Sequence, residues 1–348
     1  MPSSYQSILV LRLSAMGDVI LILPLLTRLA TKPQIKITFV VSKAYYPLCA
    51  HLAQQIEIIA IDKPKTWRDY LHLYHLFKKR HFDLLFACQA SFRIHLLYPL
   101  ISAKKKIGFD AKRSKDLHQL FIDESIPYRP NHLADSFQQF ADYIHIPPVP
   151  VSWNFPPPPA LKNSLQQQVA TRAIWIALTP CASKQERSPQ PSFWIDLITK
   201  IFEETSYGVI LTGSRTAIEK KYAEEISHFF SDDQARLLNW VGCTTLDELR
   251  ATLSLTKCLI APDTGTLHLA NAIKTPTIGL YAVANPELSG PYDYPSYVIN
   301  RYKEAVCQFL HKDPQTIRWG VRVHHPLAMS LISAEVTFQR LTEVMQRE

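Results

Sequence analysis

Glycine is scarce in this chain, with nine among 348 residues. No Gly-x-Gly-x-x-Gly stretch occurs, and doubly wound proteins that hold nicotinamide dinucleotides bind the pyrophosphate through that stretch. The sequence therefore argues against a nicotinamide-dependent dehydrogenase. No Asp-x-Asp pair occurs either, and we expect neither a metal ion nor an organic cofactor.

Long hydrophobic runs and paired cysteines are also missing. The longest apolar stretch, 19–26, is too short to cross a bilayer, and the opening residues lack the basic start of a secretory signal. The six cysteines show no Cys-x-x-Cys spacing, so we expect reduced thiols in the core. These features predict a cytoplasmic protein. A hydrophobic content of 47% with 20% charged residues is typical of a globular chain.

The net charge of +8 is unevenly distributed. Residues 1–150 hold 19 Lys and Arg against 11 Asp and Glu, whereas residues 151–348 hold 19 against 19. Between 93 and 115, seven basic residues accompany one acid, Asp110. This asymmetry indicates an acidic partner, which is a nucleic acid, an anionic lipid or an acidic saccharide. The alternative is a solvated basic surface without a ligand.

Short apolar runs alternate with helical patterns in the first half. The expected strands are 8–13, 35–41, 57–61, 83–87 and 106–109. The expected helices are 18–30, 44–54, 66–80, 92–102 and 131–144. Such alternation predicts a parallel sheet with helices on both faces.

A proline-rich stretch, 147–159, then predicts a stiff linker and a domain boundary. The second half alternates in the same way. Its expected strands are 174–179, 209–211, 237–241, 258–261 and 277–281, and its expected helices are 193–204, 217–230, 246–255, 264–273 and 333–346. We therefore expect an α/β protein with two doubly wound Rossmann-like domains, 1–150 and 160–330, and a terminal helix in 331–348. Ligands of such folds bind at the carboxyl ends of the strands, here in a cleft between the domains.

The most informative motif lies at 258–281, where an apolar run is followed by Asp263-Thr-Gly-Thr-Leu-His268 and a second apolar run. This pattern predicts a strand, a helix with Asp263 as its N-cap, and a strand. The free N–H groups at the helix start suit a diphosphate, and His268 lies one turn after Thr264 on the same helical face. The alternative is that Asp263 only caps the helix and His268 only packs.

A second motif is Gly17-Asp18, where the first strand turns into the first helix. A carboxylate at that sheet edge is suited to take a proton from a bound hydroxyl. The alternative is an ordinary acidic residue that interacts with the helix dipole.

Two further segments carry basic residues. The loop 179–194 contains Lys184 and Arg187, which either contact a diphosphate or are solvated. Helix 66–80 places Trp67 and other aromatic residues on one face and ends in three basic residues. It either lies on an anionic membrane surface or, as we favour, covers the sheet.

Together these pieces resemble glycosyltransferase family 9, the ADP-heptose:lipopolysaccharide heptosyltransferases, with the two-domain GT-B architecture. The resemblance covers nearly the full length. The matching segments are Ser14–Val19, Asp83–Gln89, Lys106–Lys115, Val241–Leu246 and Asp263–Ala272. The middle segments are more similar to heptosyltransferase I, which adds the first heptose to the inner Kdo sugar, than to heptosyltransferase II.

The resemblance implies an inverting heptosyl transfer from ADP-heptose, or a related nucleotide sugar, to anionic Kdo–lipid A. It implies that Asp18 is the general base. It also implies peripheral contact with the cytoplasmic face of the inner membrane and no nucleic-acid partner. The implied donor-binding residues are Lys184, Arg187, Glu219, Thr244, Asp263, Thr264, Gly265 and His268. The implied acceptor-binding residues are Gly17, Arg93, Lys112, Arg113 and Lys115.

The chain departs from the family pattern at several positions. Glu186 stands where the family has a lysine on the phosphate side, so Lys184 or Arg187 must substitute or donor binding is impaired. Cys181 and Ala182 replace small polar residues, Ala90 replaces a glycine, and 282–286 differs from the usual turn. Two alternatives therefore stay open: a family 9 transferase with another nucleotide sugar or acceptor, and a non-catalytic sugar-nucleotide or glycolipid-binding descendant.

Overall fold

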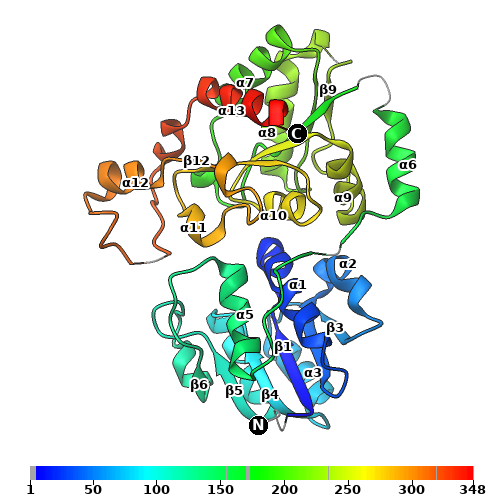
Figure 1. Ribbon diagram of the computed structural model, residues 1–348, viewed down its shortest axis with the longest axis vertical. Coiled ribbons are helices and arrows are strands. Elements are labelled where there is room, and N and C mark those ends of the chain that lie inside the picture. Colours follow the sequence, from blue (N-terminus) through cyan, green and yellow to red (C-terminus); the bar gives the residue numbers. More distant parts are fainter. Residues whose placement is uncertain (1–4, 154, 170–172, 234, 319, 348) are drawn as a thin grey trace. The chain divides into compact units, whose positions relative to one another are not determined.

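The computed structural model describes residues 5–153, 155–169, 173–233, 235–318 and 320–347. The chain divides into two units, 1–153 and 154–348, each built on a six-stranded sheet (Figure 1). Every strand pair in both sheets is parallel. The prediction of two doubly wound α/β domains is confirmed.

The N-terminal sheet has the strand order β3-β2-β1-β4-β5-β6. Its strands are β1 (Ser7–Leu11), β2 (Lys36–Ser42), β3 (Glu57–Ile61), β4 (His81–Ala87), β5 (Ser102–Gly108) and β6 (Glu124–Ser125). Its longer helices are α1 (Met16–Ala30), α3 (Trp67–Phe77) and α5 (Leu133–Tyr143). The order in which strands are added reverses between β1 and β4, so the loops that follow these two parallel strands diverge and leave room for a ligand at their carboxyl ends.

Alternating side chains of the strands serve the two faces of this sheet. Phe86 of β4 packs against Phe140 of α5, with ring centroids 5.2 Å apart, on the face that α1 also covers. The neighbouring Leu85 points to the opposite face, where it clusters with Leu73 and Phe77 of α3. Short helices α4 (Phe92–His95), η3 (Tyr98–Leu100) and η4 (His118–Phe121) complete that second face.

Two predicted helices of this domain are shorter than expected. The segment 44–54 forms η1 (Lys43–Tyr45), α2 (Tyr46–Cys49) and η2 (Ala50–Leu52) rather than one helix. The segment 92–102 is split into α4 and η3, and Pro99, which has no N–H to continue a helix, lies in η3. Strand β5 also begins earlier than predicted, at Ser102.

The first half of the predicted linker is anchored to the N-terminal domain by hydrogen bonds. Arg28 of α1 is 1% exposed, and its Nε donates to the carbonyl of Pro147 at 3.0 Å. Its Nη2 pairs with Asp142 of α5 at 2.7 Å. Trp153 donates from Nε1 to the carbonyl of Ile20 at 2.7 Å. The second half of the proline run starts a helix that the sequence reading missed, α6 (Pro159–Gln168), because proline suits the first turn of a helix.

The C-terminal sheet has the order β12-β11-β10-β7-β8-β9. Its strands are β7 (Trp175–Leu178), β8 (Gly208–Leu211), β9 (Leu237–Asn239), β10 (Cys258–Pro262), β11 (Thr277–Tyr281) and β12 (Ile299–Asn300). The helices around it are α7 (Pro191–Glu204), α8 (Ala217–Phe229), α9 (Leu246–Leu255), α10 (Gly265–Ala272), α11 (Pro286–Ser289), α12 (Tyr302–Ala305) and α13 (Ala334–Arg347). A π-helical turn, η8 (Val306–Leu310), follows α12.

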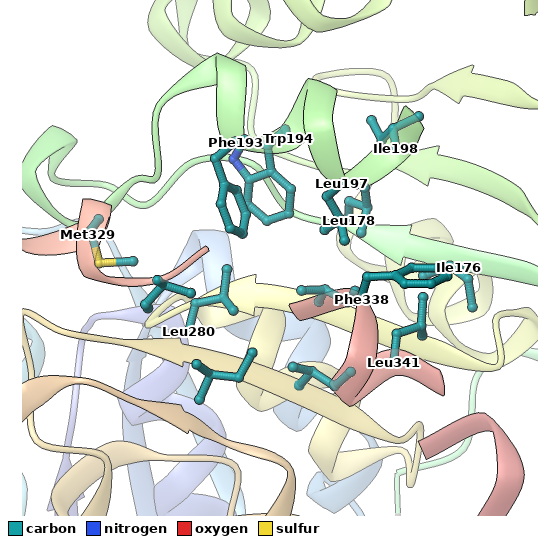
Figure 2. Packing of buried hydrophobic residues seen from close by; sticks show 14 of the residues in the cluster. Ile176, Leu178, Phe193, Trp194, Leu197, Ile198, Leu280, Met329, Phe338 and Leu341 are labelled. Atoms are coloured by element: carbon teal, nitrogen blue, oxygen red, sulfur yellow. The ribbon is translucent and has the colours of Figure 1, made fainter. Parts of the chain in front are cut away.

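The core of this domain joins the terminal helix to the sheet. Trp194 and Leu197 of α7 are fully buried beside Leu178 of β7, and Phe338 and Leu341 of α13 pack into the same cluster (Figure 2). Helix α13 lies beside α7 (Figure 1). The terminal helix is therefore part of the C-terminal domain's core.

Four of the six cysteines are buried and two, Cys243 and Cys307, are exposed. The expectation of six core thiols is therefore wrong at these two positions, because both lie in loops or short turns at the surface. All six are free thiols. Within the described residues, no helix is both long and apolar enough to span a membrane.

Two buried histidines form a hydrogen-bonded chain in the N-terminal domain. Nδ1 of His95 lies 2.9 Å from the carbonyl of Asp116, and Nδ1 of His118 lies 3.0 Å from Nε2 of His95. Nε2 of His118 accepts from the backbone N–H of Phe109. These partners fix both rings as neutral Nδ1–H tautomers. Burial and the neighbouring His95 lower the pKa of His118 from 6.5 to about 4.

This histidine pair predicts acid sensitivity of the fold. Above pH 6.5 both folded and unfolded states keep His118 neutral, but between pH 6.5 and 4 only the unfolded state binds the proton. The free energy of unfolding should therefore fall by about 3 kcal/mol as the pH drops through this window. We expect the melting temperature to fall between pH 7.5 and pH 5, and to fall less in His118→Gln. His72→Gln, at an exposed histidine, should behave like the wild type, and an unchanged pH dependence in His118→Gln would contradict the assignment.

Candidate functional site

In the N-terminal domain, Asp18 lies in the first turn of α1, directly after β1. Its Oδ2 accepts from the backbone N–H of Ala15 at 3.0 Å and forms an ion pair with Arg12. Arg12 also donates to the carbonyl of Cys88 beyond β4. Among the described residues both contacts fall on Oδ2, and the Asp18 side chain is 29% exposed. The carboxylate is thus held in one orientation through contacts to one of its two oxygens.

Three side chains at the carboxyl edge of this sheet were not predicted from the sequence. Arg12 is one, and Tyr45, after β2, is the second. Burial first, and the nearby Asp18 carboxylate second, raise the pKa of Tyr45. The third is Lys63, after β3, whose pKa is lowered by burial and by the charges of Arg93 and Arg12. Each follows a strand, and that position was the available signal.

A hollow of about 710 Å³ lies beside these residues. Tyr45 and Lys63 line it, together with Lys65 and His72. It is bounded by the carboxyl ends of β2 and β3 and by α3. Lys43, Asp62 and Asp69 also line it, so three lysines accompany two carboxylates, and this small positive excess at the edge of a parallel sheet is suited to an anionic ligand.

The predicted acceptor residues fall into two groups. Arg93 and Lys115 are exposed, and Lys112 lies 4.7 Å from the ring centroid of Tyr128. Arg113, in contrast, is held inside its own domain by an ion pair with Asp110, and it also donates to Gln139 and to the carbonyl of Pro127, both at 2.7 Å. Binding an acceptor through Arg113 would break these bonds, so the geometry does not support that expectation. Gly17 is buried in the first turn of α1.

The sequence predicted Asp263 as the N-cap of α10. In the C-terminal domain the N-cap is instead Thr264. The Thr264 hydroxyl accepts from the N–H of Leu267 at 3.3 Å. Both residue types cap helices well, and the helix begins one residue later than predicted. Asp263, which is 8% exposed, is therefore free of the capping role.

Asp263 is instead paired with Arg187. Nη1 of Arg187 donates to Oδ2 of Asp263 at 2.8 Å and to its carbonyl at 3.1 Å, and Nη2 donates to Ser183 at 2.7 Å. Both side chains are about nine-tenths buried. Burial and then the Asp263 charge raise the pKa of the neighbouring Tyr281. Arg187 therefore fixes Asp263 through Nη1, while its buried Nε has no partner within the described part of the chain. The expectation that it reaches a diphosphate stays a prediction.

A distant segment, 321–325, brings two more polar side chains, Arg322 and His324, to this place. Val323 is fully buried, and its N–H donates to the carbonyl of Val283 after β11 at 2.9 Å. His324 pairs with Glu186 through Nδ1 and Oε1 at 2.7 Å. Nη2 of Arg322 lies 3.9 Å from Oδ2 of Asp263, and its side chain is 45% exposed. No local pattern in the sequence pointed to Arg322.

The remaining predicted donor residues also follow strands of this sheet. Glu219, in the first turn of α8, accepts from the N–H and the hydroxyl of Ser214, both at 2.6 Å. A Cβ at Gly213 would lie 2.9 Å from Oε2 of Glu219, so a larger residue there would require the Glu219 carboxylate to shift. Thr244 directly precedes the N-cap of α9, and Lys184 is exposed in the loop after β7.

The two remaining members of this set belong to α10. Gly265 is its first residue, and His268 is buried within it. In the described part of the chain, no group of three or more His, Cys, Asp or Glu side chains is arranged to hold a metal ion.

Comparison with known proteins gives consistent matches. The profile of glycosyltransferase family 9 (heptosyltransferase) matches residues 70–314. The lipopolysaccharide core heptosyltransferase OpsX of Haemophilus influenzae is 30% identical over 336 residues, which cover 95% of this chain and 94% of that protein.

Solved structures share the fold at lower identity. A glycosyl transferase family 9 protein from Veillonella parvula is 18% identical, covers 100% of this chain and 99% of its own, and gives a TM-score of 0.77. An Escherichia coli heptosyltransferase solved with ADP is 18% identical, covers 98% of each chain, and gives a TM-score of 0.69.

Two doubly wound domains, each with polar residues at the carboxyl ends of its strands, match the two-domain GT-B architecture. The fold matches over nearly the whole chain support this class. The chain belongs to glycosyltransferase family 9 (heptosyltransferase). The family resemblance noted from the motifs is thereby confirmed.

The buried Arg187–Asp263 pair predicts strong coupling between its two members. Arg187→Met leaves a buried carboxylate without its main partner, so we expect a loss of about 3 kcal/mol in the free energy of unfolding. Asp263→Asn together with Arg187→Met should cost less than the sum of the single changes. Chemical denaturation of the four proteins measures the coupling.

The exposed pair Lys200–Glu335 is the matched control. Its side chains are 32% and 52% exposed, so its coupling should stay below about 1 kcal/mol. Additive effects at Arg187 and Asp263 would show that the two side chains do not depend on one another.

Proposed function

We propose that this enzyme transfers a heptose from ADP-heptose to the inner core, Kdo–lipid A, of lipopolysaccharide. The relative from Haemophilus influenzae is a lipopolysaccharide core heptosyltransferase. An Escherichia coli heptosyltransferase with this fold was solved with ADP and with ADP-2-deoxy-2-fluoro heptose. The observation that carries the proposal in this chain is the start of α10, which follows β10 next to Asp263 and two guanidinium groups.

The donor diphosphate would bind at the first turn of α10. Backbone N–H groups there are suited to phosphate oxygens. Arg322 is the cation we assign to the diphosphate, since Arg187 is occupied by Asp263 and position 186 is a glutamate. Asp263 would accept hydrogen bonds from heptose hydroxyls, with Thr264, Gly265 and His268 near the sugar and phosphates. Lys184, Glu219 and Thr244 remain candidates for the nucleotide.

The reaction needs a base on the acceptor and a stabilised leaving group on the donor. Asp18 takes the proton of the acceptor hydroxyl, whose oxygen attacks the anomeric carbon with inversion. The bond from that carbon to the diphosphate breaks, and ADP departs with the electron pair. Arg12 holds the Asp18 carboxylate in place, while Arg322 and the N–H groups of α10 neutralise the diphosphate. This scheme uses only groups of the chain and no metal.

The acceptor would be held by the cations of the N-terminal domain. Kdo–lipid A carries carboxylates and phosphates, and Lys63, Arg93, Lys112 and Lys115 are the residues we assign to them. Among these residues, Lys63 gives the clearest indication of an anionic ligand. Burial and the charges of Arg93 and Arg12 lower its pKa, and a bound anion would favour its charged form. Since this acceptor is anchored in lipid, the reaction would take place at the cytoplasmic face of the inner membrane.

A second candidate is a family 9 transferase that uses a different nucleotide sugar. One observation favours it: Glu186, paired with His324, places a carboxylate in the loop where the family has a lysine. A changed loop charge would alter which donor is bound. The acceptor and the mechanism would otherwise be the same.

The proposal is tested by mass spectrometry of the products formed from Kdo₂–lipid A with ADP-heptose, with UDP- and GDP-hexoses in parallel reactions. We expect addition of one heptose, and a kcat lower by about 10² to 10⁴-fold in Asp18→Asn because the general base is lost. ADP binding by Asp18→Asn should equal that of the wild type. Product from another nucleotide sugar alone would favour the second candidate, and full activity of Asp18→Asn would remove the base assignment.

The role of Arg322 is tested by donor kinetics. Arg322→Ala should lower kcat/KM for the donor by about tenfold or more and weaken ADP binding, because a charge-assisted contact is lost. Arg322→Lys should recover part of the loss. Arg301→Ala is the matched control, since Arg301 is 41% exposed and pairs with Glu304. Unchanged ADP binding by Arg322→Ala would exclude the assignment.

A further inference from the structure

One side of the N-terminal domain carries large apolar side chains that are exposed to solvent. They come from α3, α4 and η4 and the residues next to them, on the face of the sheet opposite to α5. We call this surface the apolar face, and its members are Trp67, Leu71, Phe92, Leu96, Leu117 and Leu120. Their exposed fractions range from 39% for Leu96 to 75% for Leu120, with 70% for Trp67.

Hydrogen bonds join the three elements of the apolar face into one surface. The hydroxyl of Tyr70, on α3, donates to the carbonyl of Arg93, on α4, at 2.8 Å. The N–H of Phe92 donates to Oδ2 of Asp116 at 3.4 Å, which joins α4 to the segment before η4. The six side chains therefore belong to adjacent elements and not to scattered positions.

On helix α3, the exposed apolar residues lie on a different side from those that pack into the core. Leu73 and Phe77 are its buried residues, and Tyr70 and Leu76 pack partly against the same cluster. Trp67 and Leu71, one turn apart, point away from that cluster. The prediction that this helix covers the sheet thus accounts for its inner side only.

Exposed basic side chains lie close in sequence to members of the apolar face. Lys65 and Arg68 flank Trp67 in sequence, Arg93 follows Phe92, and Lys115 lies two residues before Leu117; all four are exposed. The two nearby carboxylates, Asp69 and Asp116, accept hydrogen bonds from backbone N–H groups. These four cations outnumber the two carboxylates, so the local net charge around the apolar residues is positive.

Leu117 has a backbone conformation that is unfavourable for leucine, and packing inside the domain does not compensate for it. Its φ of 62° lies in the left-handed region, which a leucine rarely adopts, and its side chain is 64% exposed. A glycine or asparagine would adopt this backbone with less strain. Leucine here gains no burial inside the domain, so a benefit outside the domain is indicated.

We propose that the apolar face inserts into the interfacial region of an anionic membrane, with Lys65, Arg68, Arg93 and Lys115 at the lipid head groups. Apolar side chains rimmed by Lys and Arg are the features of proteins that lie on such membranes. The proposal deepens the proposed function, on which its setting rests, because Arg93 adjoins both this surface and the acceptor cations. Docking would hold those cations near a lipid-anchored acceptor.

The test is sedimentation of the full chain with vesicles of phosphatidylcholine, with and without phosphatidylglycerol. These vesicles contain neither donor nor acceptor, so the outcome is independent of the sugar chemistry. We expect binding to the anionic vesicles and little to the neutral ones. Trp67→Ser with Leu117→Ser should lower the partition coefficient about tenfold or more, because two apolar side chains no longer insert.

The matched control is Ile218→Ser with Phe229→Ser on α8 of the C-terminal domain. Ile218 is 70% and Phe229 63% exposed, close to the values of Trp67 and Leu117. The control pair should bind vesicles like the wild type, and both pairs should keep the wild-type melting temperature. A brominated lipid should quench the fluorescence of the wild type more than that of Trp67→Phe.

Three outcomes would overturn the proposal. One is no binding to anionic vesicles, and another is equal loss of binding in the test and control pairs. The third is a wild-type dimer that the test pair converts to a monomer, which would make the apolar face an interface between two copies. Failure of sugar transfer with intact vesicle binding would instead count against the proposed function alone.

Discussion

All strands of each sheet run in the same direction, and this constraint determines where chemistry can take place. Every loop that leaves a carboxyl end emerges at one edge, so residues far apart in sequence meet there. In the N-terminal domain, Arg12, Tyr45 and Lys63 follow three different strands and still influence the charge of the same small region. In the C-terminal domain, Arg187 and Asp263, 76 positions apart, form one buried ion pair.

The sequence predicted the sheets well because their signal is local. Short apolar runs such as 8–13 and 258–261 correspond to β1 and β10, since buried parallel strands are continuously hydrophobic. Helix boundaries were less accurate where proline was involved. Pro99 divided a predicted helix, whereas Pro159 started one inside the presumed linker. Proline thus has opposite effects inside a helix and at its first turn.

The candidate site was predicted by residue type more than by role. Asp18, Asp263 and His268 do lie at carboxyl ends of strands or at the helices that follow them. The sequence did not reveal that Arg187 forms an ion pair with Asp263. Nor did it reveal that Arg322, in a segment after η8, approaches the same carboxylate. Such pairings depend on how loops fold back on each other, and no spacing along the chain encodes them.

The two domains handle anions in different ways. The N-terminal domain carries the whole net positive charge and presents exposed cations, as suits a large, multiply charged lipid. The C-terminal domain has no net charge, and near α10 the Arg187 guanidinium is matched by the Asp263 carboxylate. Under the proposed function, such a site would bind a diphosphate through a few oriented groups rather than through excess charge. Under that proposal Arg322, the half-exposed cation beside Asp263, would act in surroundings of little net charge, and its position would determine the preference for one ligand.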